Sequence, residues 1–275
     1  MHRRIVSVCI PCLRARSWYF LIGLLAVPLT RYLERGTLFY CRERALSSVM
    51  VRPKEEDAEM ITDRELYWER EFKLSQFQRW QREGLLPPLK GCQQVPQCLI
   101  SITDVDRIVW PGAFVHSFKD DYKFDGRNGV WHQTQAYCTK FLMKKFGALT
   151  PDFSTPRNLH EIFCRYNLLR SRMVGWEMES WGIPVIPTLI WWSEDSLEFC
   201  LAGLPRESVC AVSTVCVMRS KDDKRMFQKC LLKACDILRP STLLVYGSTN
   251  GMDFCGQRVK AFPNGTYDWT HLENK

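Results

Sequence analysis

Apolar runs of strand length alternate with longer helical patterns from about residue 113 to residue 248. The strand-like runs begin near residues 113, 148, 183, 208 and 242, at intervals of 25 to 35 residues. This spacing is typical of right-handed β–α–β crossovers, in which a helix joins consecutive parallel strands. The pattern therefore predicts an α/β fold with alternating strand–helix units and a mainly parallel sheet. Because five or six strands are too few for a regular eight-stranded barrel, a partial or distorted TIM-barrel-like fold and an open sheet are both compatible with it.

The expected elements follow from apolar periodicity and from Gly and Pro punctuation. The strands are predicted at 113–117, 148–153, 183–192, 209–215 and 243–246, with short additional runs at 99–102 and 259–262. The helices are predicted at 134–146, from Thr155-Pro156 to Gly182, and at 222–239. The longest helix is expected to bury Leu159, Ile162, Tyr166, Leu169, Met173 and Trp176.

Composition divides the chain into three parts. Residues 1–60 read as a leader, and residues 61–90 read as a helical extension that begins at the capping box Thr62–Glu65. Residues 91–270 contain the strand–helix alternation and are predicted to form the α/β domain.

The leader is basic, and residues 1–33 contain no acidic residue. The apolar run 18–29 is about a dozen residues long, shorter than the roughly 20 needed to cross a bilayer. Three interpretations stay open: a non-native or disordered leader with a true start at Met50 or Met60, a membrane anchor in contact with lipid through residues 18–29, and a cleaved signal. We expect a cytoplasmic protein, with membrane association through this segment as the alternative.

The formal net charge of +8 suggests a nucleic-acid partner, but its distribution does not. Residues 1–49 carry eight Arg and two Glu, so the remaining residues carry only +2. The folded part is therefore nearly neutral, and outside the leader we expect no strong bulk attraction to phosphates. A local basic groove is still compatible with these numbers, and the partners cannot be named from the sequence.

The thirteen cysteines form an odd-numbered set that is scattered through strand and helix patterns. Such a distribution does not make a disulfide framework. We interpret most of them as buried, reduced thiols, in agreement with a cytoplasmic protein.

The motifs of the commonest enzyme classes are absent. The sequence contains no GxxxxGK(S/T), GxGxxG, HExxH or GxSxG, and its five histidines are widely separated. The sequence therefore predicts no metal site and no cofactor, and it leaves open whether the protein is an enzyme.

The carboxyl ends of the predicted strands provide the candidate site, because ligands of parallel sheets bind at that edge. His116 and Asp152 would supply a base and its orienting carboxylate, with Asp120 close by. The candidate ligand-binding residues are Ser154, Trp191, Ser213, Thr214, Tyr246 and Ser248. Each of these has a plainer interpretation as a helix cap, strand end or core residue.

Arg170 falls on the apolar side of the longest predicted helix. An inward arginine suggests anion binding, but this one lies about 22 Å from the presumed site at 1.5 Å per residue. A structural ion pair or a clamp on backbone carbonyls is therefore favoured.

An ordered series of short motifs carries a family resemblance. It consists of Phe118–Asp121, Pro151–Ser154, Asn167 with Arg170–Arg172 and Gly175, Gly182–Pro187 with Trp191, Gly203–Pro205, Ser213-Thr214 and Tyr246-Gly247. Over about residues 90–262 this series resembles a bacterial domain of unknown function, number 4417, that is often found on prophages and plasmids. The resemblance implies a mobile-element context and supplies no activity or cofactor.

Two classes of function follow. The first is a small enzyme or ligand-binding protein that uses the strand ends, with hydrolysis as the candidate reaction. The second is an accessory protein of a mobile element or prophage that binds nucleic acid or another protein. The near-neutral body favours the first class, and the resemblance slightly favours the second.

Overall fold

The computed structural model describes residues 67, 69, 71–73 and 86–264, except for residues 157, 216, 218, 219 and 255. The leader and the apolar run 18–29 lie outside these residues, as does most of the predicted helical extension. Among the helices that are described, none combines the length and the apolarity that a bilayer crossing requires.

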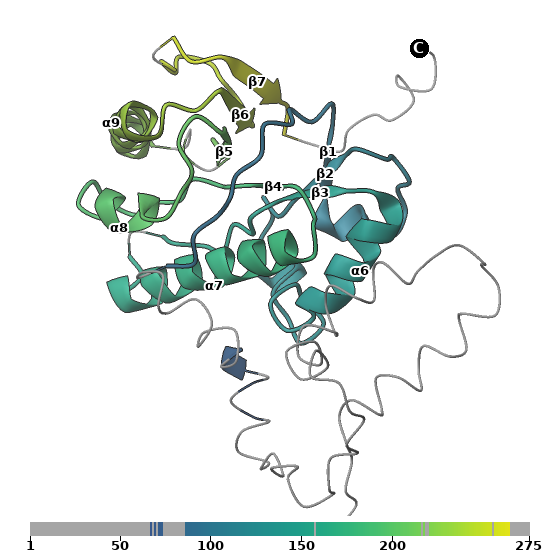
Figure 1. The fold of residues 1–275 in the computed structure, drawn as a ribbon. Coiled ribbons are helices and arrows are strands. Elements are labelled where there is room, and N and C mark those ends of the chain that lie inside the picture. Colours follow the sequence, from purple (N-terminus) through teal and green to yellow (C-terminus); the bar gives the residue numbers. More distant parts are fainter. Residues whose placement is uncertain are drawn as a thin grey trace, which may run out of the picture. The chain divides into compact units, whose positions relative to one another are not determined.

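Seven parallel strands of the described residues form the centre of the fold and follow one another in chain order (Figure 1). One sheet contains β1 (Leu99–Ser101), β2 (Phe114–His116), β3 (Gly147–Leu149) and β4 (Val185–Ile186), and the other contains β5 (Val209–Ser213), β6 (Thr242–Tyr246) and β7 (Val259–Phe262). A parallel bridge between Thr188 and Ala211 connects the two. The prediction of an α/β fold with a mainly parallel sheet is confirmed.

Within residues 86–264, four α-helices accompany the strands: α6 (Thr134–Lys144), α7 (Glu161–Ser180), α8 (Leu197–Leu201) and α9 (Lys221–Leu238). Two 3-10 turns, η3 (Ile102–Asp104) and η4 (Asp121–Lys123), follow β1 and β2. The helices pack on one face of the strands, where α7 lies beneath β1–β4 and α9 beside β5 and β6 (Figure 1).

Strand residues alternate between two apolar layers. In β5 and β6, Cys210 and Leu243 belong to the layer under α8 and α9, whereas their neighbours Ala211 and Leu244 belong to the opposite layer. This period of two is the geometry of strands that are buried on both faces. The inner layer receives residues from all seven strands: Leu99, Phe114, Leu149, Ile186, Val209, Ala211, Leu244, Tyr246 and Phe262.

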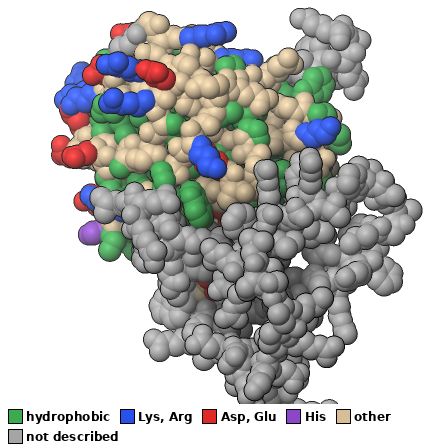
Figure 2. All heavy atoms as spheres, viewed as in Figure 1, with side chains coloured by type: hydrophobic (Ala, Val, Ile, Leu, Met, Phe, Trp, Pro, Cys, Tyr) green, Lys and Arg blue, Asp and Glu red, His purple; other side chains and the backbone are tan. Residues whose placement is uncertain are grey.

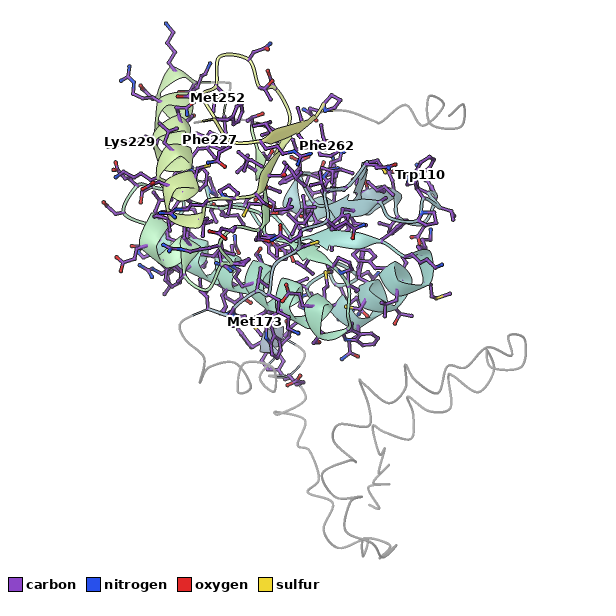
Figure 3. All side chains as sticks on the ribbon, turned by 45° about the horizontal axis from the view of Figure 1, so that its top comes forward. Trp110, Met173, Phe227, Lys229, Met252 and Phe262 are labelled. Carbon is purple, nitrogen blue, oxygen red and sulfur yellow. The ribbon has the colours of Figure 1, made fainter. Side chains whose placement is uncertain are left out.

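The ring centroids of His116 on β2 and Tyr246 on β6 are 4.5 Å apart although β3, β4 and β5 lie between these strands, so the sheet curves around this layer. The edges of the curved sheet are β1 and β7, and no strand pairing joins them in the described part of the chain. Phe262, on β7 and labelled in Figure 3, belongs to this interior layer.

A segment that precedes β1 crosses the amino ends of the strands. The Cys92 N–H donates to Ser208 Oγ, and the Val209 N–H donates to the Cys92 carbonyl, both at 2.9 Å. Gln93 also bonds both the Glu207 carbonyl and the Ser241 hydroxyl, just before β5 and β6 begin. This segment therefore covers part of the amino edge and leaves the carboxyl edge as the natural place for a ligand.

The structure corrects three expectations about local elements. Helix α7 begins at Glu161 after the N-cap His160, and not at Thr155-Pro156. The strand predicted at 183–192 is only Val185–Ile186, because Pro184 and Pro187 lack the N–H that a ladder needs. Helix α8 was not predicted at all.

The predicted apolar face of the long helix is also partly wrong. Ile162 is 64% exposed, whereas Cys164, Leu168 and Arg172 are buried. Helix α7 contacts both helix-side apolar clusters, so a broad arc of its surface is covered, and a single stripe describes it poorly. Gly175 lies in that arc, and a Cβ atom there would stand 2.6 Å from Thr150 Cγ2.

The cysteine interpretation is confirmed for the described residues. None of their eight cysteines is in a disulfide, and seven of them are buried: Cys98, Cys138, Cys164, Cys200, Cys210, Cys230 and Cys235.

Candidate functional site

Three aromatic side chains meet at the carboxyl end of the interior layer. The ring centroids of His116 and Tyr246 are 4.5 Å apart, and Phe118 stacks 5.3 Å from His116 and 5.0 Å from Tyr246. His116 ends β2 and Tyr246 ends β6, so their contact joins strands that are not neighbours in the sheet. We call His116, Phe118 and Tyr246 the ring group.

Strand register brings two serines to the same level. Ser101 on β1 is the pairing partner of His116, and Ser213 on β5 is the pairing partner of Tyr246. The structure therefore brings together three of the predicted residues, His116, Ser213 and Tyr246. It adds Ser101 and Phe118, which the pattern of strand ends did not select.

His116 is held as a neutral hydrogen-bond donor. It is 4% exposed, and its Nδ1 accepts a hydrogen bond from the Phe118 N–H at 3.1 Å. The ring proton of the neutral form must then reside on Nε2. Burial, and to a lesser extent the charge of Lys119, lowers the pKa of His116 to about 3. Within the described residues, no hydrogen bond joins this ring to Asp152, so the predicted base-and-carboxylate pair is not seen as a direct contact.

Asp152 lies in the loop that follows β3. Its backbone N–H donates to Ser117 Oγ at 2.7 Å, which ties this loop to the end of β2. The side chain is half-buried, and its carboxyl group makes no hydrogen bond or ion pair with any described residue. Burial, together with the nearby Asp121 carboxylate, raises the pKa of Asp152 to about 7. A carboxyl group in this range both gives and takes protons near neutrality.

The second carboxylate, Asp121, holds the loop beside Asp152. It accepts hydrogen bonds from the Ser154 N–H at 3.1 Å and from the Ser154 hydroxyl at 2.9 Å. Asn167 on α7 then donates to the Ser154 carbonyl. These bonds give Ser154 a clear structural role. Asp120, in contrast, is exposed and pairs with Lys123 at 3.1 Å.

Thr214 and Ser248 connect the ends of β5 and β6. Thr214 Oγ1 donates to the Ser248 carbonyl at 2.8 Å, and the Thr214 N–H donates to the Tyr246 carbonyl. Gly247 lies between them at a φ of +111°, and a Cβ atom there would stand 2.5 Å from Thr214 Oγ1. Only glycine fits this close approach without strain. Thr214 is buried and Ser248 is exposed.

Trp191 lies apart from the ring group. Its ring packs 5.2 Å from Phe227 in the cluster between the strands and α9, and Phe227 is labelled in Figure 3. It is buried there as a core residue.

Because the pKa of Asp152 is raised in the folded state, the free energy of unfolding should depend on pH. The native state keeps this proton up to about pH 7, whereas an unfolded aspartate loses it near pH 3.9. The free energy of unfolding therefore falls as pH rises through this window, and the loss is complete above about pH 7. We expect Asp152→Asn to equal the wild type near pH 4 and to exceed it by about 1–3 kcal/mol at pH 8.

Urea unfolding at pH 4, 6 and 8 measures this difference. The exposed carboxylate Asp236, on the last turn of α9, gives a matched control in Asp236→Asn. Parallel pH profiles for the wild type and Asp152→Asn would show that Asp152 ionises normally.

Comparison with known proteins places the chain among phage-related sequences. It is 36% identical over 143 residues to the Gene 1 protein of Mycobacterium phage L5, a match that covers 52% of this chain and 60% of that protein. The Gene 1 protein of Mycobacterium phage D29 is 33% identical over 153 residues, with 55% of each chain covered. The chain thus spans less than two thirds of the length of these relatives. No solved structure matches it.

These relatives confirm the expected link to mobile elements at the level of sequence similarity. Residues 81–262 match a family described as a domain of unknown function (DUF4417), a range that contains the ring group, Asp121 and Asp152. Because this match covers more than half of the chain, the protein belongs to the DUF4417 family.

Proposed function

We propose that the protein binds a small molecule at the carboxyl ends of β2, β3, β5 and β6 and acts on it by proton transfer, as a hydrolytic enzyme does. The observation that carries this proposal is the carboxyl group of Asp152. It is half-buried, it has no hydrogen-bond partner among the described residues, and it lies near a second carboxylate. Carboxyl groups with such a raised pKa are concentrated at functional sites.

The chemistry of the neighbouring groups supports this role. Asp152 would transfer the proton, and the negative charge of Asp121 helps to keep its pKa near 7. The neutral Nε2–H of His116 would donate to a substrate oxygen, because its other nitrogen is occupied by the Phe118 N–H. Ser213 and Tyr246 lie at the same level and would contact the substrate.

Nucleic-acid binding is the alternative, and α9 is the place to consider it. Lys221, Arg225, Lys229 and Lys233 follow one another at intervals of one helical turn. Lys229 projects from α9 in Figure 3. However, Glu194 pairs with both Lys229 and Lys233, and Asp222, Asp223 and Asp236 share the helix. Figure 2 shows this mixture of positive and negative side chains at its upper left. A balanced surface attracts phosphates weakly, so we favour the small-molecule site.

A ligand screen on the full chain tests the proposal. Thermal melting is measured against nucleotides, sugar phosphates, amino acids and short carboxylic acids, with duplex and single-stranded oligonucleotides alongside. We expect a small molecule to raise the melting temperature of the wild type and of Asp236→Asn. Its affinity for Asp152→Asn should be at least tenfold weaker, since the asparagine loses both the O–H donor and the negative charge with which the carboxyl group would bind the ligand.

Two results would overturn the proposal. One is a ligand that binds Asp152→Asn as tightly as it binds the wild type. The other is stabilisation by oligonucleotides alone, with an affinity that falls steeply as salt is added, which would establish the alternative.

A further inference from the structure

The loop that follows β2 contains two positive charges without a partner among the described residues, Lys119 and the exposed Arg127. Three of its charged residues are satisfied: Asp120 pairs with Lys123, Asp125 pairs with Arg170, and Asp121 binds Ser154. The ammonium group of Lys119 makes no hydrogen bond or ion pair with any described residue. Lys119 is only partly exposed, although an unpaired lysine normally extends into water.

A tight turn holds Lys119 beside the ring group. The Lys119 N–H donates to the Ser117 carbonyl at 2.7 Å, and the preceding N–H, of Phe118, donates to His116 Nδ1. The positive charge of Lys119 is also close enough to disfavour protonation of His116. The turn therefore fixes the backbone of Lys119 at the carboxyl edge, where the charge of its side chain acts on the imidazole.

The imidazole contributes a second, uncharged donor. The Nε2–H of His116 has no hydrogen-bond partner in the described part of the chain, and the side chain is more than nine-tenths buried. Nε2 is not among the fully buried polar atoms that lack a partner, so it still reaches solvent at this edge, and a ligand oxygen could replace that water.

We propose that Lys119 and His116 Nε2–H together form a subsite for an anionic group, a carboxylate or a phosphate, on the small molecule that binds at this edge. The inference rests on the proposed function, because it assigns a chemical class to the ligand of the same site. Lys119 supplies the charge, and the imidazole supplies a directed hydrogen bond that would orient the anion relative to Asp152. Asp121 makes no ion pair with Lys119 among the described residues, and its carboxylate instead accepts hydrogen bonds from Ser154.

Anion titration of the full chain tests this subsite. The imidazole nitrogens are observed by ¹⁵N NMR, and the His116 signals are assigned with a His116→Gln variant. Inorganic phosphate and acetate are added as separate probes, and sodium chloride at matched ionic strength is the control for screening. We expect the Nε2 signal of His116 to shift and saturate with phosphate, acetate or both, and not with chloride. The anion that binds more tightly distinguishes the phosphate from the carboxylate source.

Variants then identify the cation. We expect Lys119→Gln to weaken anion binding at least fivefold without a loss of melting temperature, because its side chain has no partner to lose. Lys145→Gln is the matched control: Lys145 is exposed and follows α6 at the amino side of β3. Chloride shifts equal to those of both anions, or unchanged binding in Lys119→Gln, would overturn the subsite.

The outcomes separate this inference from the proposed function. An uncharged ligand that depends on Asp152 and not on Lys119 would remove the anion subsite and keep the function. Anions that bind at His116, together with ligands that are indifferent to Asp152→Asn, would keep the subsite and remove the function.

Discussion

Replacing Arg170 with methionine should lower the free energy of unfolding by about 3–5 kcal/mol. Arg170 Nη1 donates to both carboxylate oxygens of Asp125, at 2.8 and 2.7 Å, and Nη2 donates to Asn167 at 2.7 Å. The side chains of the ion pair are 11% and 15% exposed. Methionine fills much of the same volume but leaves Asp125 without its counter-charge in a poorly hydrated place.

Aromatic rings make this site specific for arginine. The guanidinium carbon lies 4.1 Å from the centre of the Phe153 ring and 5.2 Å from that of Tyr166. A planar guanidinium can stack on rings and bond a carboxylate at the same time, which an ammonium cannot do. We therefore expect Arg170→Lys to recover only part of the loss, although it keeps the charge.

Urea unfolding compares these variants with a control on the same helix. Arg165 pairs with Glu161 one turn away, with both side chains about half exposed, so Arg165→Met should cost less than about 1 kcal/mol. Equal small losses for Arg165→Met and Arg170→Met would show that the Arg170 pair is no more valuable than a surface ion pair.

The structural role of Arg170 could be anticipated from the sequence, but its estimated distance from the site was wrong. Its position among apolar residues indicated an ion pair or a clamp on backbone carbonyls, and the bond to Asp125 shows that it is the ion pair. The estimate of 22 Å assumed a helix that begins near Thr155. The helix begins at Glu161, because the loop 151–156 is held by tertiary bonds from Ser117 and Asp121 that no local signal announces.

Long periodic segments were predicted well, and short ones were not. Helix α9 lies within one residue of its predicted range at each end, since the cap Ser220 and the breaker Pro240 bracket a strong amphipathic pattern. Helix α8 has five residues, and its N-cap Ser196 makes no side-chain capping bond. The carbonyls at its end are instead bound by the buried Arg172, which donates to Cys200 and Ala202. This stabilisation comes from another helix and leaves no trace in the local sequence.

The candidate site was likewise predicted only in part from the sequence. The parallel-strand rule located His116, Ser213 and Tyr246 at one edge, because it depends only on where the strands end. The rule could not predict that Ser101 pairs with His116, because that depends on the register of β1 against β2. It also could not predict the ring contact between β2 and β6, because that depends on the curvature of the sheet. It also selected Trp191, whose side chain points into the helix-side core.

A second buried ion pair, between Lys73 and Glu177, involves the short described part of the N-terminal extension. Lys73 is 8% exposed, and its Nζ donates to Glu177 Oε2 at 3.0 Å and to Thr134 Oγ1 at 2.7 Å. The ammonium also lies 5.2 Å from the centre of the Trp131 ring. These contacts join residue 73 to α6 and α7, so they tie the extension to the domain.

Glu177→Leu should lower the free energy of unfolding by about 3–5 kcal/mol, because it leaves the Lys73 ammonium buried without a counter-charge. Lys73→Met should cost a similar amount by isolating Glu177. The double variant should recover most of either loss, since two apolar side chains need no partner and the desolvation penalty of both charges disappears. Urea unfolding of the three variants completes the cycle, and Lys140→Met, which breaks a largely exposed pair with Asp106, is the surface control. If the loss of unfolding free energy in the double variant equalled the sum of the two single losses, Lys73 and Glu177 would not interact. The extension would then not be held to the domain by this ion pair.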